Sequence, residues 1–259
     1  MHHASRILNA CYTSAMQEWL ALACALLAAS ATVLGGSLIL VKRRFDDHFL
    51  NYSIAFGAGF MLGASALAML PESFKVNART PLWFLAGYLT IHFFEHTIVP
   101  HFHFGEETHS DAVVNPIVGY TSIFGLSIHN LFDGISIGSG FLISPILGFL
   151  IFGAVVLHKV PDGFTIASIM LASGWPARKA FHASVILGLS TLAGAVLIGL
   201  FKGMVSAALP FSAGVTFYIA ATDLLPVINE HKRLRYSFAF FAGILVFYLS
   251  DMVLSKWMT

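Results

Sequence analysis

Charged residues are scarce in this sequence. Only 10% of its 259 residues are Asp, Glu, Lys or Arg, and 57% are hydrophobic, whereas ordinary soluble domains carry about 25% charged residues. A chain with a mean hydropathy of +0.80 could not cover a water-exposed surface with polar groups, so we expect the bilayer to be its solvent. The formal net charge of +1 offers no basic face, which argues against nucleic acid as a partner.

Cysteine and nucleotide-binding motifs are also scarce or absent. The two cysteines, Cys11 and Cys24, form neither a C-x-x-C pair nor a disulfide framework. There is no Walker loop and no G-x-G-x-x-G dinucleotide fingerprint. We therefore do not expect ATP-driven transport by this chain alone, and no organic cofactor is indicated.

Long apolar runs make up most of the chain. A helix needs about 20 apolar residues to cross the hydrocarbon core of a bilayer. Eight runs are candidates, over residues 18–41, 51–71, 81–100, 116–140, 145–172, 180–201, 207–228 and 236–255. We expect an all-α membrane protein with eight transmembrane helices in a single domain, residues 1–259. A short tail over 1–17 precedes the first helix, which is too long for a cleaved signal.

Basic residues predict the orientation of these helices. Eight of them fall on one side when the first loop is placed inside, namely Lys42, Arg43, Arg44, Arg178, Lys179, Lys232, Arg233 and Arg235. Five fall on the other side, namely Arg6, Lys75, Arg79, Lys202 and Lys256. Cytoplasmic loops are enriched in Lys and Arg, so this bias favours both termini outside.

A sequence pattern that occurs twice in the chain predicts an inverted repeat. Ala58-Gly59 in the second run is followed by Leu70-Pro71, and Ala213-Gly214 in the seventh run is followed by Leu225-Pro226 at the same spacing. In the topology above, these two helices run in opposite directions, as is common in transporters. We expect helices 1–3 and 6–8 to be related in this way around helices 4 and 5.

Two short stretches, each reading H-x-x-x-D-G, contain the candidate metal-ligating residues. His129 and Asp133 lie in one apolar run, and His158 and Asp162 lie at equivalent positions 29 residues later. On a helix, residues i and i+4 share a face. Two imidazoles and two carboxylates complete the tetrahedral set that Zn²⁺ prefers. Ionisable groups inside a membrane usually face a bundle interior or an aqueous path, so we expect one shared metal site near mid-membrane.

Two neighbours of these histidines are polar as well. Asn130 follows His129 and could supply a further oxygen ligand or form an interhelical hydrogen bond. Lys159 follows His158. Its ammonium could neutralise an aspartate and occupy the space of a second cation, because it lies too near mid-helix to reach the membrane surface.

A second polar cluster closes the third run and fills the following loop, a His-rich segment over about 101–115 on the predicted cytoplasmic side. Such tracts often bind metal loosely. The histidines expected to do so are His92, His96, His101, His103 and His109.

Four further polar residues could line a cation pathway. Asp223 is the deepest of them in the membrane, within the seventh run. The others are Glu72, Glu230 and His231, which could equally be ordinary interfacial residues.

At the two H-x-x-x-D-G motifs and the Leu-Pro helix endings, the sequence resembles the ZIP family of divalent metal transporters. This resemblance implies eight helices, both termini outside and the inverted repeat. It also implies uptake of Zn²⁺, Fe²⁺, Mn²⁺ or Cd²⁺ into the cytoplasm by alternating access, with the metal as transported substrate. His129, Asp133, His158 and Asp162 fall on the principal metal site of that family, and Asn130 falls on a residue that serves a second site in some members.

The sequence departs from the family pattern in two ways. Asp133 and Asp162 stand where members typically have Glu, and residues 189–194 contain no acid where some members carry one. Together with Lys159, these differences predict one metal at the centre. Two other functions stay open, a membrane-embedded metalloenzyme and a metal sensor that does not transport. We also expect a plasma membrane, such as a bacterial inner membrane, and a homodimer.

Overall fold

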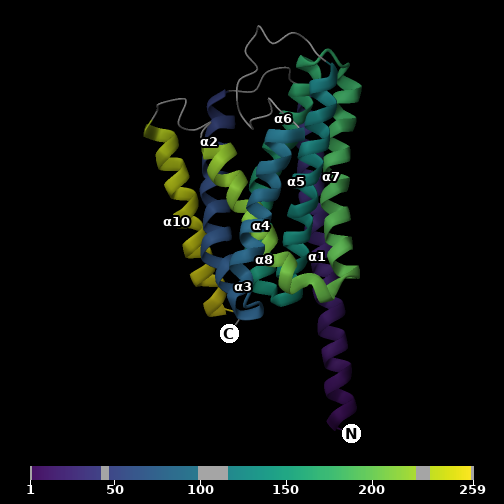
Figure 1. Ribbon diagram of the computed structural model, residues 1–259, viewed down its shortest axis with the longest axis vertical. Coiled ribbons are helices and arrows are strands. Elements are labelled where there is room, and N and C mark those ends of the chain that lie inside the picture. Colours follow the sequence, from purple (N-terminus) through teal and green to yellow (C-terminus); the bar gives the residue numbers. More distant parts are fainter. Residues whose placement is uncertain (1, 42–46, 99–115, 226–233, 258–259) are drawn as a thin grey trace.

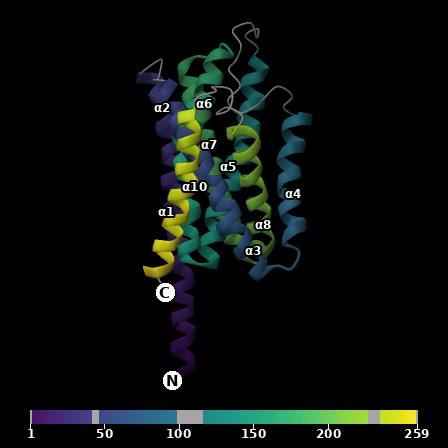
Figure 2. The same cartoon turned by 90° about the vertical axis from the view of Figure 1, so that its left-hand side faces the viewer.

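Helices account for all regular structure in the part of the chain described by the computed structural model, residues 2–41, 47–98, 116–225 and 234–257. In chain order these helices form eight rods, some made of two or three consecutive helical segments. The rods run along one long axis, with α1 extending beyond the bundle (Figures 1 and 2). The α-helices are α1 (His2–Val41), α2 (Asp47–Gly63), α3 (Leu70–Val76), α4 (Thr80–Phe93), α5 (Pro116–Ile143), α6 (Pro145–Ala172), α7 (Ala177–Leu200), α8 (Val205–Tyr218) and α10 (Leu234–Trp257).

Three rods contain a π-helical segment. The second rod joins α2 to α3 through η1 (Ala64–Met69), the third continues from α4 into η2 (Phe94–Ile98), and the seventh continues from α8 into η4 (Ile219–Leu224). A short 3₁₀ turn, η3 (Lys202–Met204), connects α7 to α8. π-Helical segments are rare and occur frequently at functional sites.

Six of these rods are long and apolar enough to cross a membrane, which makes the chain an all-α membrane protein. They contain Ala15–Leu38, Ile54–Val76, Pro145–Leu171, Ala177–Leu200, Lys202–Thr222 and Leu234–Lys256. The rods of α4 and α5 are the two other expected spans. α5 is 28 residues long but carries His129, Asn130 and Asp133 in its interior, which lowers its hydropathy. The tail expected over residues 1–17 is helical from His2 onward.

A tight turn between α5 and α6 sets the two motif-bearing helices against each other. Ser144 is the N-cap of α6, and its Oγ accepts a hydrogen bond of 3.2 Å from Leu147 N. Pro145 occupies the first helical position, where its missing N–H costs nothing. Because the turn is so short, α5 and α6 run antiparallel, and residues at similar depths on the two helices can meet.

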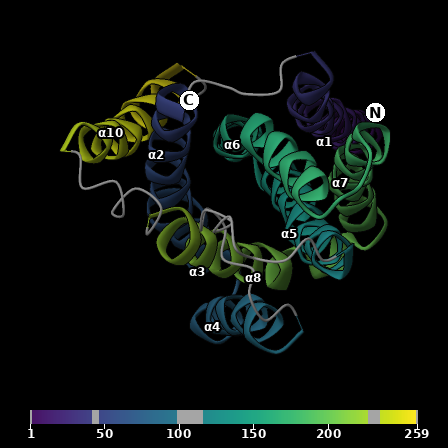
Figure 3. The same ribbon diagram turned by 90° about the horizontal axis from the view of Figure 1, so that it is seen from above.

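The rods form two groups (Figure 3). The first bundle contains α1, α5, α6 and α7, and the second bundle contains α2, α4, α8 and α10. Fewer contacts join the bundles than hold each together. Between them, the rings of Phe132 on α5 and Phe211 on α8 lie 5.1 Å apart. A Cβ at Gly57 of α2 would lie 3.8 Å from the Cβ of His158 on α6.

Facing glycines let helices cross closely at four places. At each of these glycines, an added Cβ would lie between 1.8 and 2.2 Å from a carbonyl oxygen of the opposite helix, closer than any real contact. Small residues permit such backbone approach in membrane bundles. Two crossings hold the first bundle together and two the second, in the order Gly35 with Gly163, Gly134 with Gly194, Gly59 with Gly243, and Gly87 with Gly214.

Candidate metal centre

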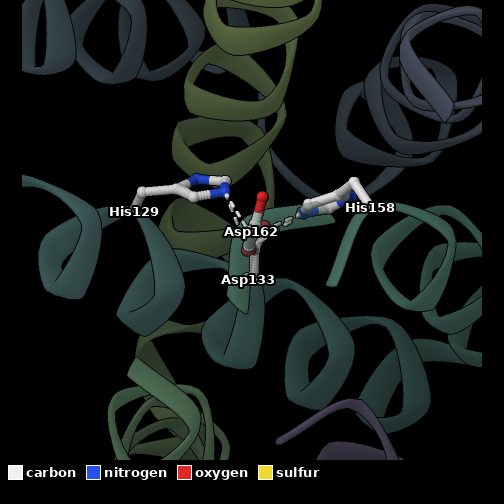
Figure 4. Close-up of side chains that lie close together, drawn as sticks. All are labelled: His129, Asp133, His158 and Asp162. Atoms are coloured by element: carbon white, nitrogen blue, oxygen red, sulfur yellow. Dashed lines mark hydrogen bonds and ion pairs between the residues drawn. The ribbon is translucent and has the colours of Figure 1, made fainter. Parts of the chain in front are cut away.

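Four buried side chains converge where α5 meets α6 (Figure 4). His129 and Asp133 come from α5, and His158 and Asp162 from α6. One ligand atom from each lies within 4.8 Å of the others. Each residue is at most 5% exposed. The i, i+4 spacing puts each pair on one helix face, and the antiparallel hairpin turns the two faces towards each other.

The two imidazoles approach the carboxylates from opposite sides (Figure 4). Nε2 of His129 lies 3.2 Å from Asp133 Oδ2, and Nε2 of His158 lies 3.3 Å from the same oxygen. Asp162 Oδ2 is 3.7 and 3.8 Å from these two nitrogens. Two nitrogen and two oxygen donors around one point form a ligand set suited to Zn²⁺ and similar transition metals.

A backbone hydrogen bond orients His158. Its Nδ1 donates to the carbonyl oxygen of Ala154 at 3.0 Å. With Nδ1 bonded to the backbone, Nε2 is the ring nitrogen left for a metal, and it lies at a hydrogen-bond distance of 3.3 Å from Asp133 Oδ2. Metal-binding histidines are oriented in the same way, by a hydrogen bond from the other ring nitrogen.

Neither ring nitrogen of His129 has a hydrogen-bond partner among the described residues, although both atoms are buried. Its Nε2 lies near Asp133 Oδ2, but the geometry is not that of a hydrogen bond. A buried polar group without a partner costs about 1–3 kcal/mol. Coordination of a cation between this nitrogen and the carboxylates would remove that cost.

Lys159 lies inside the same cluster and is fully buried. Its Nζ donates to Asn130 Oδ1 at 2.7 Å, to Asp162 Oδ2 at 3.1 Å and to Asp133 Oδ2 in a close contact. A buried ammonium is tolerated only with such partners. Lys159 is therefore part of the centre, as a permanent cation beside the four donor residues.

Asn130 is held by three hydrogen bonds. Its Oδ1 accepts from Lys159 and, at 3.1 Å, from Thr191 Oγ1 of α7, while its Nδ2 donates 2.8 Å to the carbonyl of Leu126. Its carboxamide oxygen therefore points to the lysine. Thr191 is not predicted from the sequence, because its only signal there is a hydroxyl and Ser190 beside it carries the same group.

Three other predicted site residues that the structure describes lie outside this cluster, namely Glu72, His92 and His96. Glu72 in α3 pairs with Lys75 at 2.6 Å on the surface. His92 and His96 are exposed at the end of α4, where His92 Nδ1 lies 3.4 Å from the hydroxyl of Tyr218. The backbone of Asp223 lies in η4, but its side chain is outside the described residues. Also outside them are His101, His103, His109, Glu230 and His231.

One further pattern at the centre resembles an enzyme motif. Residues Gly134–Gly138 read G-x-S-x-G, the signature of a hydrolase nucleophile elbow. An elbow needs a strand-to-helix turn, but these residues lie within α5, and Ser136 Oγ donates 2.8 Å to the carbonyl of Phe132. The pattern therefore forms no exposed nucleophile.

Comparison with known proteins points to a transporter family. The sequence model of a family described as ZIP Zinc transporter matches residues 101–251, more than half of the chain. A zinc transporter ZupT of Chlorobium limicola is 32% identical over 82% of this chain and 88% of its own length. A zinc transporter ZupT of Stenotrophomonas maltophilia is 30% identical over 92% of this chain and 97% of its own length.

A eukaryotic relative is similar over a shorter stretch. The zinc transporter zipt-7.2 of Caenorhabditis elegans is 28% identical over 51% of this chain, and the matched part covers only 31% of that longer protein. The similarity to the bacterial proteins extends over nearly their full length. Together, the family match, the bacterial relatives and the apolar helices identify this chain as a member of the ZIP family of metal transporters.

Proposed function

We propose that this protein is a secondary transporter that moves divalent transition metals, Zn²⁺ first among them, across a membrane towards the cytoplasm. The observation that carries the proposal is the set of four convergent donors midway along two membrane helices, with Nε2 of both histidines facing the same carboxylate oxygens. His129, Asp133, His158 and Asp162 would bind the metal as transported substrate. The buried, unbonded ring of His129 supports this assignment.

The ligand set favours borderline metals over Mg²⁺ or Ca²⁺, which prefer oxygen ligands alone. Fe²⁺, Mn²⁺ and Cd²⁺ remain candidate substrates beside Zn²⁺. Asp is one methylene shorter than Glu, so the centre must be compact. Lys159 occupies the position next to Asp133 and Asp162 where a second cation would need the same oxygens, which supports a single bound metal.

The two-bundle architecture supports alternating access as the mechanism. The centre lies in the first bundle at its boundary with the second, since His158 lies beside Gly57 of α2 and Phe132, next to Asp133, packs against Phe211 of α8. Each bundle is tightly joined by two glycine crossings, whereas side chains separate the bundles. A rigid-body motion of one bundle against the other would expose the metal first on one side and then on the other.

The helix crossings support the inverted repeat. If α1, α2 and α4 correspond to α7, α8 and α10, and α5 to α6, the crossing of α1 with α6 maps onto that of α7 with α5. The crossing of α2 with α10 likewise maps onto that of α8 with α4. The π-helices η1 and η4 each begin five residues after the crossing glycine of their rod. Both termini lie at the same end of the molecule (Figure 1), as eight spans require.

The direct test is metal uptake into liposomes containing the purified protein, with Zn²⁺, Mn²⁺, Fe²⁺ and Cd²⁺ compared in parallel. Saturable uptake is expected, and His129→Ala and His158→Ala should each lower Zn²⁺ uptake about 10–100-fold, because water can replace one imidazole only weakly. His182→Ala, at an exposed position near the start of α7, is the matched control. Metal binding without flux would favour a sensor, and turnover of a lipid substrate would favour an enzyme.

Lys159 is expected to limit the centre to one bound metal ion. Lys159→Asp replaces the ammonium with a third carboxylate beside Asn130, Asp133 and Asp162, and should raise bound Zn²⁺ from about one to about two ions per protein. Elemental analysis of the protein after equilibrium dialysis measures this ratio. Lys202→Asp makes the same change at an exposed lysine and should leave the ratio at about one. An unchanged ratio in Lys159→Asp would show that the lysine does not hold the place of a second metal.

Bacterial relatives over nearly the whole chain support a bacterial inner membrane as the location, and the homodimer stays a proposal. Fractionation of cell membranes and mass measurement of the purified protein in detergent test these two points.

A further inference from the structure

Lys159 and the histidines compete for the same two oxygen atoms. Asp133 Oδ2 lies 3.2 and 3.3 Å from Nε2 of His129 and His158, and it is also an atom that Lys159 Nζ contacts. Asp162 Oδ2 likewise lies 3.1 Å from Lys159 Nζ and within 3.8 Å of both imidazoles. A metal bound between the histidines and the carboxylates must therefore share these oxygens with the ammonium.

We propose that Lys159 acts as a resident cation that takes over the two carboxylates whenever the metal leaves, so that the unloaded transporter can return to its starting orientation. The inference rests on the proposed transport function. A transporter of this kind must move twice in each cycle, once loaded and once unloaded. Lys159 would serve the second movement.

Charge explains why the unloaded movement needs such a group. Two carboxylates and one ammonium leave the unloaded centre with one net negative charge, and a divalent metal gives the loaded centre one net positive charge. Without Lys159, the loaded centre would be neutral, but the unloaded one would carry two negative charges. The cost of burying charge grows with its square, so the unloaded centre would cost about four times as much. Lys159 makes the two movements similar in electrostatic cost.

A hydrogen-bond network from α7 keeps the ammonium in position. Thr191 Oγ1 donates to Asn130 Oδ1, which also accepts from Lys159 Nζ, and Leu126 O fixes the amide group of Asn130. Lys159 is fully buried, so its ammonium cannot turn to solvent when the metal arrives. The ammonium can instead keep its bond to Asn130 while the metal takes the carboxylate oxygens. Thr191 is thus a positioning residue for the lysine.

The test compares net uptake with exchange in the same liposomes. Net uptake of radioactive ⁶⁵Zn²⁺ into metal-free liposomes requires the unloaded movement. Exchange of ⁶⁵Zn²⁺ outside for unlabelled Zn²⁺ inside requires only the loaded one. In Lys159→Met, the ratio of exchange to net uptake should rise at least about tenfold over the native protein, because only the unloaded centre becomes more costly. Lys202→Met, at an exposed lysine, should leave the ratio unchanged.

A second variant keeps the test informative if Lys159→Met does not fold. Thr191→Val removes the hydroxyl that orients Asn130 and should raise the ratio about threefold, and Thr191→Ser should restore it. If both rates fall together in the variants that fold, or the ratio stays at its native value, the proposal is wrong and the lysine is structural. Failure of the transport function itself would look different, because the native protein would show neither exchange nor net uptake.

Discussion

Asp133→Asn and Asp162→Asn are each expected to lower saturable Zn²⁺ uptake into liposomes at least about 100-fold, more than removal of either histidine. Each change removes an oxygen ligand and also removes the negative charge that attracts a divalent cation. The amide leaves Lys159 with one carboxylate and Asn130 Oδ1, so the centre is neutral instead of negative before any metal arrives. Initial rates of ⁶⁵Zn²⁺ uptake over a range of concentrations measure the loss.

The folded state should survive this substitution. Asn has nearly the same shape as Asp, and Lys159 keeps a charged partner in either variant. Gel filtration in detergent and circular dichroism should therefore match the native protein. Asp251→Asn makes the same change in α10, away from the centre, and should leave uptake within about twofold. If both single variants at the centre kept native uptake, His129, Asp133, His158 and Asp162 could not be the transport site.

Gly194→Ala should destabilise the first bundle strongly. A Cβ at this position would lie 2.0 Å from the carbonyl oxygen of Leu131 on α5, and a backbone atom cannot move aside as a side chain can. The added methyl must push α7 away from α5, with an expected cost of about 3 kcal/mol in the free energy of unfolding. For a chain of this size that corresponds to a melting temperature about 6–12 °C lower. Thermal unfolding in detergent, followed by tryptophan fluorescence, measures it.

Gly199 on the same helix offers a matched control. No atom of the part of the chain that the structure describes lies within 4 Å of a Cβ built there. Gly199→Ala should therefore leave the melting temperature unchanged or raise it slightly, since Ala favours helix over Gly by about 1 kcal/mol. Equal melting temperatures for the two variants would show that α5 and α7 do not depend on this close crossing.

Separation of α7 from α5 should also disturb the centre. Thr191 is three residues from Gly194 and reaches Asn130 from the same face of α7. If α7 moves outward, the hydrogen bond from Thr191 to Asn130 lengthens and the lysine loses its support. The glycine crossing and the polar network are therefore two parts of one interface. The crossing sets the distance between α5 and α7, and the hydrogen bonds of Thr191 and Asn130 hold the Lys159 ammonium in position.

Much of the fold could be predicted from local properties of the sequence. Apolar length predicted the positions of the rods, and the expected run over 145–172 coincides with α6 (Pro145–Ala172). The π-helices were not predicted, because such an extra residue in a helical turn is not marked by composition. Within the described residues, six of the eight expected spans meet the requirements of length and apolarity. The rods of α4 and α5 do not, and in α5 the polar residues that form the centre reduce its hydropathy.

The two His–Asp pairs were visible in the sequence because each pair lies within one helix. A spacing of i, i+4 brings side chains together whatever the rest of the protein does. The meeting of the pairs depends on the hairpin at Ser144 and on the rotation of α5 against α6. The repetition of the motif after 29 residues suggested that the two pairs meet. The distances between Nε2 and the carboxylate oxygens, however, depend on how the helices pack.

Sequence by itself determined that this chain is a helical membrane protein of the ZIP type with His129, Asp133, His158 and Asp162 as candidate ligands, because solvent preference and helical periodicity are properties of each segment alone. Only the tertiary structure decided that Lys159 contacts both carboxylates, that Asn130 turns its oxygen to that lysine, and that Thr191 supports it from α7. Apart from the i, i+3 contact of Lys159 with Asp162 within α6, these contacts join residues 26 to 61 positions apart across three helices. Their geometry follows from the angles and distances at which the helices cross. Packing of glycine against the backbone of the opposite helix sets these values, and no local sequence pattern predicts them.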